Sequence, residues 1–257
     1  MAVKDSVQQL YNGLLTCKKA VFFGGAGVST ESGIPDFRSE SGIYRTVQEY
    51  GVPPEEILSH TFFVKHPDIF YQYYRNYMLH PSAVPNAAHR GLAFLERQGV
   101  LTAVITQNID GLHQRAGSRK VLELHGSIHR NYCMDCHQSF GLDIILRGDP
   151  LPRCTRCGGL IKPDVVLYEE ALDETVLSQS ISQIQEADLM IVGGTSLNVY
   201  PAAGLLRYFH GDVGLVLINR DETPLDGRAD LVIHHKIGEV FQRLLDFYPS
   251  SQSTTSE

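Results

Sequence analysis

The chain has little of what marks membrane, secreted or nucleic-acid-binding proteins. Among its 257 residues, no apolar run approaches the roughly 20 residues that a membrane-spanning helix needs, so no membrane partner is expected. Lysine and arginine total 22 whereas aspartate and glutamate total 29, and the net charge is −7. An acidic chain does not attract nucleic acid through its overall field, so no direct nucleic-acid partner is expected either.

Cysteine is scarce, and its arrangement does not favour disulfides. The chain has five cysteines and no apolar signal segment at its N-terminus, a combination that predicts a cytoplasmic protein with a metal site. Four of the five form two C-x-x-C pairs with 17 residues between them, a spacing typical of zinc held by four thiolates. The predicted ligands of this structural zinc are Cys133, Cys136, Cys154 and Cys157.

The G-x-G-x-x-G pattern of many dinucleotide-binding proteins is also missing, although a glycine-rich loop is present. Residues 21–23 are Val-Phe-Phe, which indicates a short buried strand, and they run directly into the loop GGAG at residues 24–27. Glycines allow the backbone to approach a ligand closely, and the N–H groups of such a loop can bind an anion. The loop is therefore predicted to hold a phosphate or pyrophosphate.

Strand-like and helical segments alternate along most of the chain. The strand-like segments lie at residues 20–23, 100–105, 122–124, 164–167, 189–192, 213–218 and 231–233. Such alternation predicts an α/β fold with a Rossmann-like, doubly wound parallel sheet.

The domain organisation follows from the position of the cysteines within this pattern. Residues 1–127 and 164–248 are expected to form the Rossmann-like domain, with a small zinc-ribbon domain inserted at residues 128–163. Residues 39–61 show no clean period and suggest a loop-rich segment, and part of residues 39–80 is expected to join the small domain. The Ser/Thr-rich tail at residues 249–257 is expected to be disordered.

Polar residues follow the ends of four predicted strands. They are Gln107, Asn108, Asp110, His125, Thr195, Ser196 and Asn219. Because ligands of parallel α/β sheets bind beyond the carboxyl ends of the strands, one extended ligand such as a dinucleotide is expected across this edge. His125 is the candidate for proton transfer near neutral pH, whereas His89 and His113 lie on predicted helices and are expected to be structural.

Taken together, these motifs resemble those of the sirtuins, the NAD-dependent protein-lysine deacylases. The segments GAGVSTESGIPDFR, TQNIDGLHQRAG, ELHGS, the paired C-x-x-C, KPDVV, GTSLNVYPAA and INRDETPLD occur in the order found in that family. The resemblance extends from about residue 21 to residue 241 and is greatest to bacterial and archaeal members with a single catalytic module.

The resemblance implies a cleft between the two domains in which NAD meets an acyl-lysine protein or peptide. His125 matches the general base of the family, and Asn108 is implied as a second catalytic residue. The residues implied to contact NAD are Ala26, Thr30, Phe37, Arg38, Gln107, Ile109, Asp110, His125, Thr195, Ser196, Asn219 and Ile237.

The implied reaction removes an acetyl or other uncharged acyl group from lysine. The acyl oxygen would attack C1′ of the nicotinamide ribose and nicotinamide would leave. His125 would then accept a proton from a ribose hydroxyl. The products would be free lysine, nicotinamide and O-acyl-ADP-ribose.

Two positions depart from the pattern of the family. The family usually has Phe-Gly-Glu where this chain has Tyr168, Glu169 and Glu170, and the added charge of Glu169 predicts a preference for basic peptides. Members that prefer succinyl-lysine carry a Tyr-x-x-Arg pair on the aromatic helix. The best alignment places Tyr71 and Tyr74 there, with Arg75 one position away. Uncharged acyl groups, chiefly acetyl, are therefore expected, because a buried carboxylate needs a cation.

Two other functions stay open from the sequence. A mono-ADP-ribosyltransferase would cleave NAD and transfer ADP-ribose to an acceptor side chain, a reaction that does not require the base His125. A non-catalytic sensor would bind NAD or ADP-ribose without releasing nicotinamide.

Overall fold

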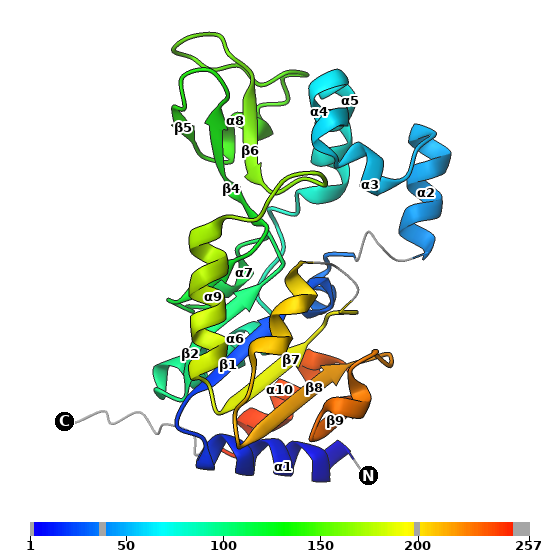
Figure 1. Ribbon diagram of the computed structural model, residues 1–257. Helices are drawn as coiled ribbons and strands as arrows, with labels where there is room; N and C mark the ends of the chain where they lie inside the picture. Colours follow the sequence, from blue (N-terminus) through cyan, green and yellow to red (C-terminus); the bar gives the residue numbers. More distant parts are fainter. Residues whose placement is uncertain (1–2, 36–39, 198–200, 249–257) are drawn as a thin grey trace, which may run out of the picture.

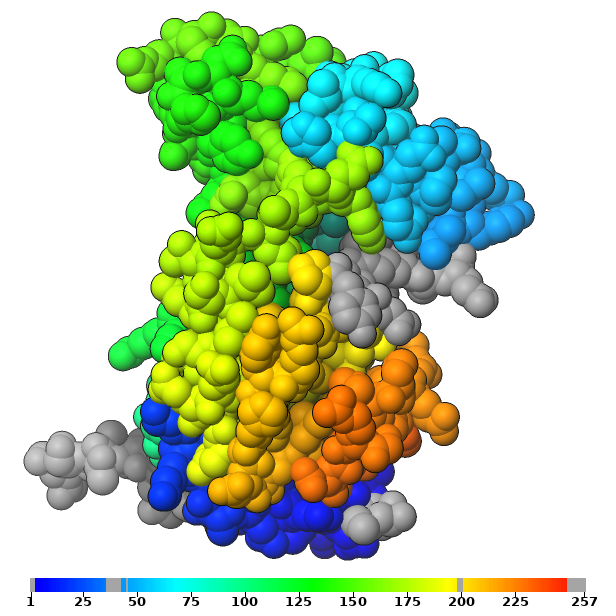
Figure 2. All heavy atoms as spheres, in the orientation of Figure 1, coloured from blue at the N-terminus to red at the C-terminus, as the bar shows by residue number. Residues whose placement is uncertain are grey.

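The computed structural model consists of a larger and a smaller lobe that meet across a narrower waist (Figure 1, Figure 2). It describes residues 3–35, 40–197 and 201–248. The predicted disordered tail at residues 249–257 lies outside this described part.

A parallel sheet forms the centre of the larger lobe. In the described part of the chain it has six strands in the order β3–β2–β1–β7–β8–β9, and each neighbouring pair is parallel. The strands are β1 (Ala20–Gly24), β2 (Leu101–Thr106), β3 (Val121–Glu123), β7 (Leu189–Gly193), β8 (Gly214–Asn219) and β9 (Leu231–His234). The predicted fold class is confirmed, and the order of the strands reverses between β1 and β7, where such sheets bind ligands.

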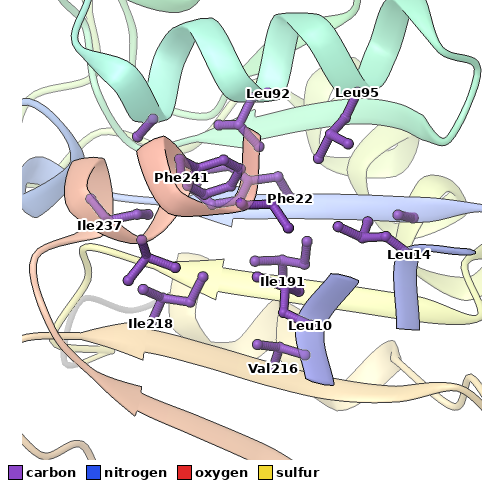
Figure 3. Packing of buried hydrophobic residues seen from close by; sticks show 14 of the residues in the cluster. Leu10, Leu14, Phe22, Leu92, Leu95, Ile191, Val216, Ile218, Ile237 and Phe241 are labelled. Carbon is purple, nitrogen blue, oxygen red and sulfur yellow. The ribbon is translucent and has the colours of Figure 1, made fainter. Parts of the chain in front are cut away.

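Helices cover both faces of this sheet because successive side chains of each strand point to opposite faces. Phe22 of β1 packs against one set of helices, whereas Val21 and Phe23 pack against another. The first set is α1 (Val3–Thr16), α6 (Ala87–Arg97) and α10 (Ile237–Leu245), and Figure 3 shows this core. The second set is α9 (Glu174–Glu186) and a 3₁₀ helix (Ala202–Tyr208). Burial of each large apolar side chain contributes about 1.5–3 kcal/mol.

Two helix starts agree with their sequence signals. Asn86 accepts a hydrogen bond from the Ala88 N–H at 2.9 Å, and Asp173 accepts one from the Val176 N–H at 2.8 Å. These side chains satisfy N–H groups that have no partner within the helix.

The smaller lobe contains an antiparallel sheet. Its strands are β5 (Ser139–Phe140), β4 (Gly126–Cys133) and β6 (Ile161–Val165), in that order. The prediction of a strand of the parallel sheet at residues 164–167 is wrong, because β6 pairs with β4 instead. Gly126 permits this close pairing, since its φ is 75° and a Cβ there would overlap the carbonyl oxygen of Asp164. The division into domains at 127/128 and 163/164 stays a prediction.

Residues 40–78 are mostly helical, so the expectation of a loop-rich segment at residues 39–61 is wrong for its described part. The helices are α2 (Glu40–Tyr50), α3 (Pro54–Ile57), α4 (His60–Lys65), α5 (Pro67–Tyr73) and a π-helical turn (Tyr74–Met78). Tyr71 and Tyr74 are fully buried and share one apolar cluster with Ile128 and Ile161 of the small sheet. The short helices α7 (Leu112–Arg115) and α8 (Asp143–Leu146) complete the α-helices of the described residues. In residues 40–61, tertiary packing stabilises helices although the local hydrophobic periodicity is weak.

None of the helices in the described residues is both long and apolar enough to cross a membrane.

Two helical glycines test the packing of the larger lobe. A Cβ at Gly91 of α6 would lie 2.5 Å from Cδ1 of the fully buried Phe241, whereas the nearest atom to a Cβ at Gly13 of α1 is 3.9 Å away. We expect Gly91→Ala to lower the free energy of unfolding by about 1–3 kcal/mol, because overpacking outweighs the gain in helix propensity. Gly13→Ala should raise it by up to about 1 kcal/mol. Chemical denaturation measures both, and equal effects would contradict this packing.

Candidate active site

Two adjoining cavities lie where the lobes meet, beyond the carboxyl ends of the strands. The larger has a volume of about 190 Å³ and the smaller about 70 Å³. Met78, Gln107 and Ile109 line both of them. His125 lines the larger cavity with Leu58, residues 165–170, Leu172 and Pro201. The smaller cavity is lined by Ala26, Ser29, Ile34, Asn108 and Asp110, among others.

Hydrogen bonds join the loops that follow β2, β7 and β8. The Gln107 N–H donates to the Gly24 carbonyl at 3.0 Å, and Gln107 Nε2 donates to Thr195 Oγ1 at 3.1 Å. The Thr195 N–H in turn donates to Asn219 Oδ1 at 2.9 Å. Three of the polar strand ends that the sequence singled out, at Gln107, Thr195 and Asn219, therefore lie at one edge of the sheet within one network.

The glycine loop after β1 touches the loop after β7 through its backbone. The Gly27 N–H donates to the Gly194 carbonyl at 2.8 Å, and a Cβ at Gly27 would lie 2.7 Å from the Gly194 Cα. Gly194 has a φ of 60°, and a Cβ there would overlap the Val28 nitrogen. Both positions require glycine, because any side chain would push the two loops apart.

A three-residue network lines the smaller cavity. Ser29 Oγ donates to Asp110 Oδ2 at 2.6 Å and accepts from Asn108 Nδ2 at 3.0 Å, and Asp110 Oδ1 accepts from the Leu112 N–H at 2.9 Å. These bonds fix the orientation of the amide and the carboxylate. Ser29 is 1% exposed and was missing from the predicted site, although its hydroxyl within the glycine loop was a signal for it.

Where the structure describes them, the remaining residues that were predicted to contact NAD do not belong to the hydrogen-bonded networks above. Thr30 Oγ1 donates to the Gly27 carbonyl at 3.0 Å, and Ser196 is exposed beyond β7. Ile237 begins α10 and is buried against Gly193. Phe37 and Arg38 lie outside the described residues. For all of these residues, contact with NAD stays a prediction.

The imidazole of His125 is oriented by the backbone. Its Nδ1 lies 2.9 Å from the carbonyl oxygen of Gln107. Because a carbonyl oxygen can only accept, Nδ1 carries the proton of the neutral ring and Nε2 carries the lone pair. This tautomer can accept a proton through Nε2, as a general base does.

His89 and His113 belong to the core, as expected. Their ring centroids are 4.7 Å apart, and the two residues are 0% and 1% exposed. Burial lowers the pKa of His89 to about 4 and that of His113 well below its usual value. Both rings are therefore neutral at pH 7, and neither lines the cavities.

The four predicted zinc ligands converge in the smaller lobe. All four Sγ atoms lie within 4.8 Å of one another, with 3.4 Å between Cys133 and Cys157 and 3.7 Å between Cys136 and Cys154. A tetrahedral zinc with Zn–S bonds of about 2.3 Å needs sulfurs roughly 3.8 Å apart, so the cluster fits one such ion. With four thiolates, such a site is closed and structural.

Comparisons with known proteins identify the family. The model of the Sir2 family matches residues 25–201. The chain is 55% identical over 246 residues to an NAD-dependent protein deacetylase of Clostridium acetobutylicum, covering 95% of this chain and 100% of that protein. It is 50% identical over 242 residues to one of Clostridium perfringens, covering 94% and 99%. The chain therefore belongs to the Sir2 family, whose members are the sirtuins.

Solved structures of the same family share the fold. A structure of Sir2 with a p53 peptide and NAD+ superposes with a TM-score of 0.82 at 38% identity, covering 93% of this chain and 97% of that one. A structure of Sir2 bound to an acetylated peptide gives a TM-score of 0.81 at 37% identity, with the same coverage.

Loss of a zinc ligand should destabilise the protein. We expect Cys154→Ser to abolish stoichiometric zinc binding and to lower the melting temperature by about 5 °C or more, because metal binding contributes folding free energy. Elemental analysis and thermal denaturation measure the two effects. The control is Cys17→Ser, since Cys17 lies in the larger lobe outside the cluster and should keep the zinc. A Cys154→Ser protein that keeps its zinc and melts like the parent would contradict this site.

Proposed function

We propose that this chain is an NAD-dependent protein-lysine deacetylase that removes acetyl and other uncharged acyl groups. The products are free lysine, nicotinamide and O-acyl-ADP-ribose. The observation that carries the proposal is His125, which lines the larger cavity with Nδ1 held by the Gln107 carbonyl. Membership in a family whose relatives are NAD-dependent protein deacetylases supports the same reaction.

The smaller cavity and the glycine loops suit NAD. When bound, NAD would supply the ribose carbon that receives the acyl oxygen as nicotinamide leaves. Ala26, Asn108, Ile109 and Asp110 line the smaller cavity and would hold the nicotinamide and its ribose. The adenosine and phosphate side would lie towards Thr30, Thr195, Ser196, Asn219 and Ile237.

Asn219 gives this assignment a physical reason. Its Nδ2 is buried and has no hydrogen-bond partner among the described residues, so a ribose hydroxyl there would satisfy it. Phe37 and Arg38 are proposed as further contacts on the family resemblance alone.

His125 and Asn108 would act on the ribose hydroxyls. With its proton held on Nδ1, His125 accepts a proton through Nε2 and makes the hydroxyl oxygen a nucleophile. The side-chain Nδ2 of Asn108 donates to Ser29 Oγ at 3.0 Å, and the backbone N–H of Asn108 donates to Thr106 Oγ1 at 3.0 Å. An amide held in this way positions a substrate without reorganising during the reaction.

The larger cavity suits an acyl-lysine side chain. Leu58, Met78, Ile109 and Leu167 give it an apolar lining that matches the aliphatic stem of lysine and an uncharged acyl group. Arg75 is not among its lining residues. The Arg75 guanidinium instead donates to the carbonyls of Ile145 and Asp149 in the small lobe, which supports the predicted preference for acetyl over succinyl.

We also propose a cytoplasmic location. The four cysteines of the smaller lobe converge as a metal site, and none of the five cysteines, all of which lie in the described residues, is in a disulfide. This use of cysteine is typical of reducing compartments.

The activity can be tested with an acetyl-lysine peptide and NAD, followed by mass spectrometry of nicotinamide and O-acetyl-ADP-ribose. We expect His125→Ala to reduce the turnover by about 10²–10⁴-fold, because it removes the general base. The control is His210→Ala, which changes an exposed histidine and should keep the activity.

Two results would contradict the proposal. Transfer of ADP-ribose to protein while the acetyl group stays in place would identify a mono-ADP-ribosyltransferase. Binding of NAD without release of nicotinamide would identify a sensor.

A further inference from the structure

Glu169 occupies a position at which a side chain costs conformational free energy. It lines the larger cavity within residues 165–170 and stands where the family usually has glycine. Its φ is 76°, in the left-handed region that glycine adopts without strain and that other residues rarely adopt. A glutamate kept in this conformation is expected to make a compensating interaction.

The carboxylate of Glu169 makes that interaction with the start of α4. Its Oε2 accepts a hydrogen bond from the Thr61 N–H at 2.9 Å. The carbonyl of the preceding residue, Tyr168, accepts one from the His60 N–H at 3.0 Å, and Ser59 Oγ accepts from the Phe62 N–H at 3.1 Å. The first three N–H groups of α4 are thus satisfied, two of them by the segment that lines the cavity.

The other side of this segment is fastened to the small sheet by Glu170. Glu170 Oε2 accepts from Lys162 Nζ at 3.0 Å and from the Leu167 N–H at 2.9 Å, and Lys162 is only 4% exposed. Glu170 Oε1 lies 2.9 Å from His60 Nδ1. Residues 167–170 are therefore held between β6 and α4, and Glu169 provides a side-chain bond on the α4 side.

We propose that Glu169 is a positioning residue for the peptide substrate, which fixes residues 167–170 against α4 so that the edge facing the peptide is preformed. The inference rests on the proposed function, because it assumes that a peptide lies along this side of the cavity. A preformed edge lowers the ordering cost of binding. Main-chain pairing with such an edge depends on its position rather than on its side chains.

The bond to Thr61 sets this role apart from simple charge attraction. The hydrogen bonds from Thr61 are the main cause that lowers the pKa of the Glu169 carboxyl, and electrostatic interactions with His60 and Lys65 add to the effect. One oxygen of the Glu169 carboxylate thus accepts a hydrogen bond from α4. The nearby positive charge of Lys65 reduces the negative potential that Glu169 creates at the peptide. Attraction of basic peptides is the competing outcome of the test.

Two substitutions separate these roles. Glu169→Gly removes the bond and relieves the backbone strain, so KM for an acetyl-lysine peptide should rise about five- to tenfold while the melting temperature stays equal or rises. Glu169→Gln keeps an acceptor oxygen for the Thr61 N–H, so its KM should stay within about twofold of the parent. A purely structural residue would not give this result, in which KM rises although the variant is as stable as the parent or more stable.

A minimal substrate and a direct measurement of peptide binding test the positioning role of Glu169 further. A single acetyl-lysine without neighbouring residues has no main chain to lie along the edge, so Glu169→Gly should turn it over like the parent. Calorimetric binding of the peptide is read without turnover, and Glu169→Gly should weaken it. If the parent binds the peptide in this way but releases no nicotinamide, the proposed function fails while the positioning role stands.

An unchanged KM and an unchanged peptide affinity in Glu169→Gly would overturn the inference. So would a Glu169→Gln variant that loses affinity as fully as Glu169→Gly, and only for peptides flanked by lysine or arginine, since that result assigns the effect to charge.

Discussion

The loops after β1 and β7 touch through their backbones, and in the proposed function this contact determines where NAD binds. Gly27 and Gly194 are close enough that a Cβ on either would meet main-chain atoms of the other loop. The contact lies where the strand order reverses, which is the point at which open parallel sheets bind ligands. Around it the loops after β2 and β8 are drawn into one hydrogen-bonded edge by Gln107, Thr195 and Asn219.

The proposed catalysis requires that both lobes contribute residues to the cavities at that edge of the sheet. The carbonyl of Gln107, which orients His125, belongs to the loop after β2, whereas residues 165–170 come from the end of the small sheet. The four-cysteine cluster and the fully buried tyrosines contribute to the packing of the smaller lobe, and none of them lines either cavity. In the proposed function, the smaller lobe presents the peptide, while the larger lobe holds the nucleotide and the base.

Much of this arrangement could be predicted from the sequence, because it depends on local signals. Buried strands ending in glycine or polar residues predicted the parallel sheet and its polar edge, and the cysteine spacing predicted the four-cysteine cluster. Residues 164–167 were assigned to the parallel sheet wrongly, since only the pairing with β4 reveals the second sheet. The helices at residues 40–65 also depend on contacts distant in sequence, which no local pattern encodes. The hydroxyl of Ser29 was visible beside the glycine loop, but its partners Asn108 and Asp110 follow another strand and could not be read from that loop.

The dependence of NAD binding on the contact between Gly27 and Gly194 is tested most directly by calorimetric titration of NAD into a variant in which this contact is disturbed. The control variant is Gly99→Ala, because Gly99 has a similarly positive φ of 76° but no atom within 4 Å of a Cβ placed there. We expect Gly194→Ala, which separates the two loops, to weaken NAD binding by at least about tenfold and Gly99→Ala to bind NAD like the parent. A folded Gly194→Ala protein that binds NAD with the parent affinity would contradict this dependence.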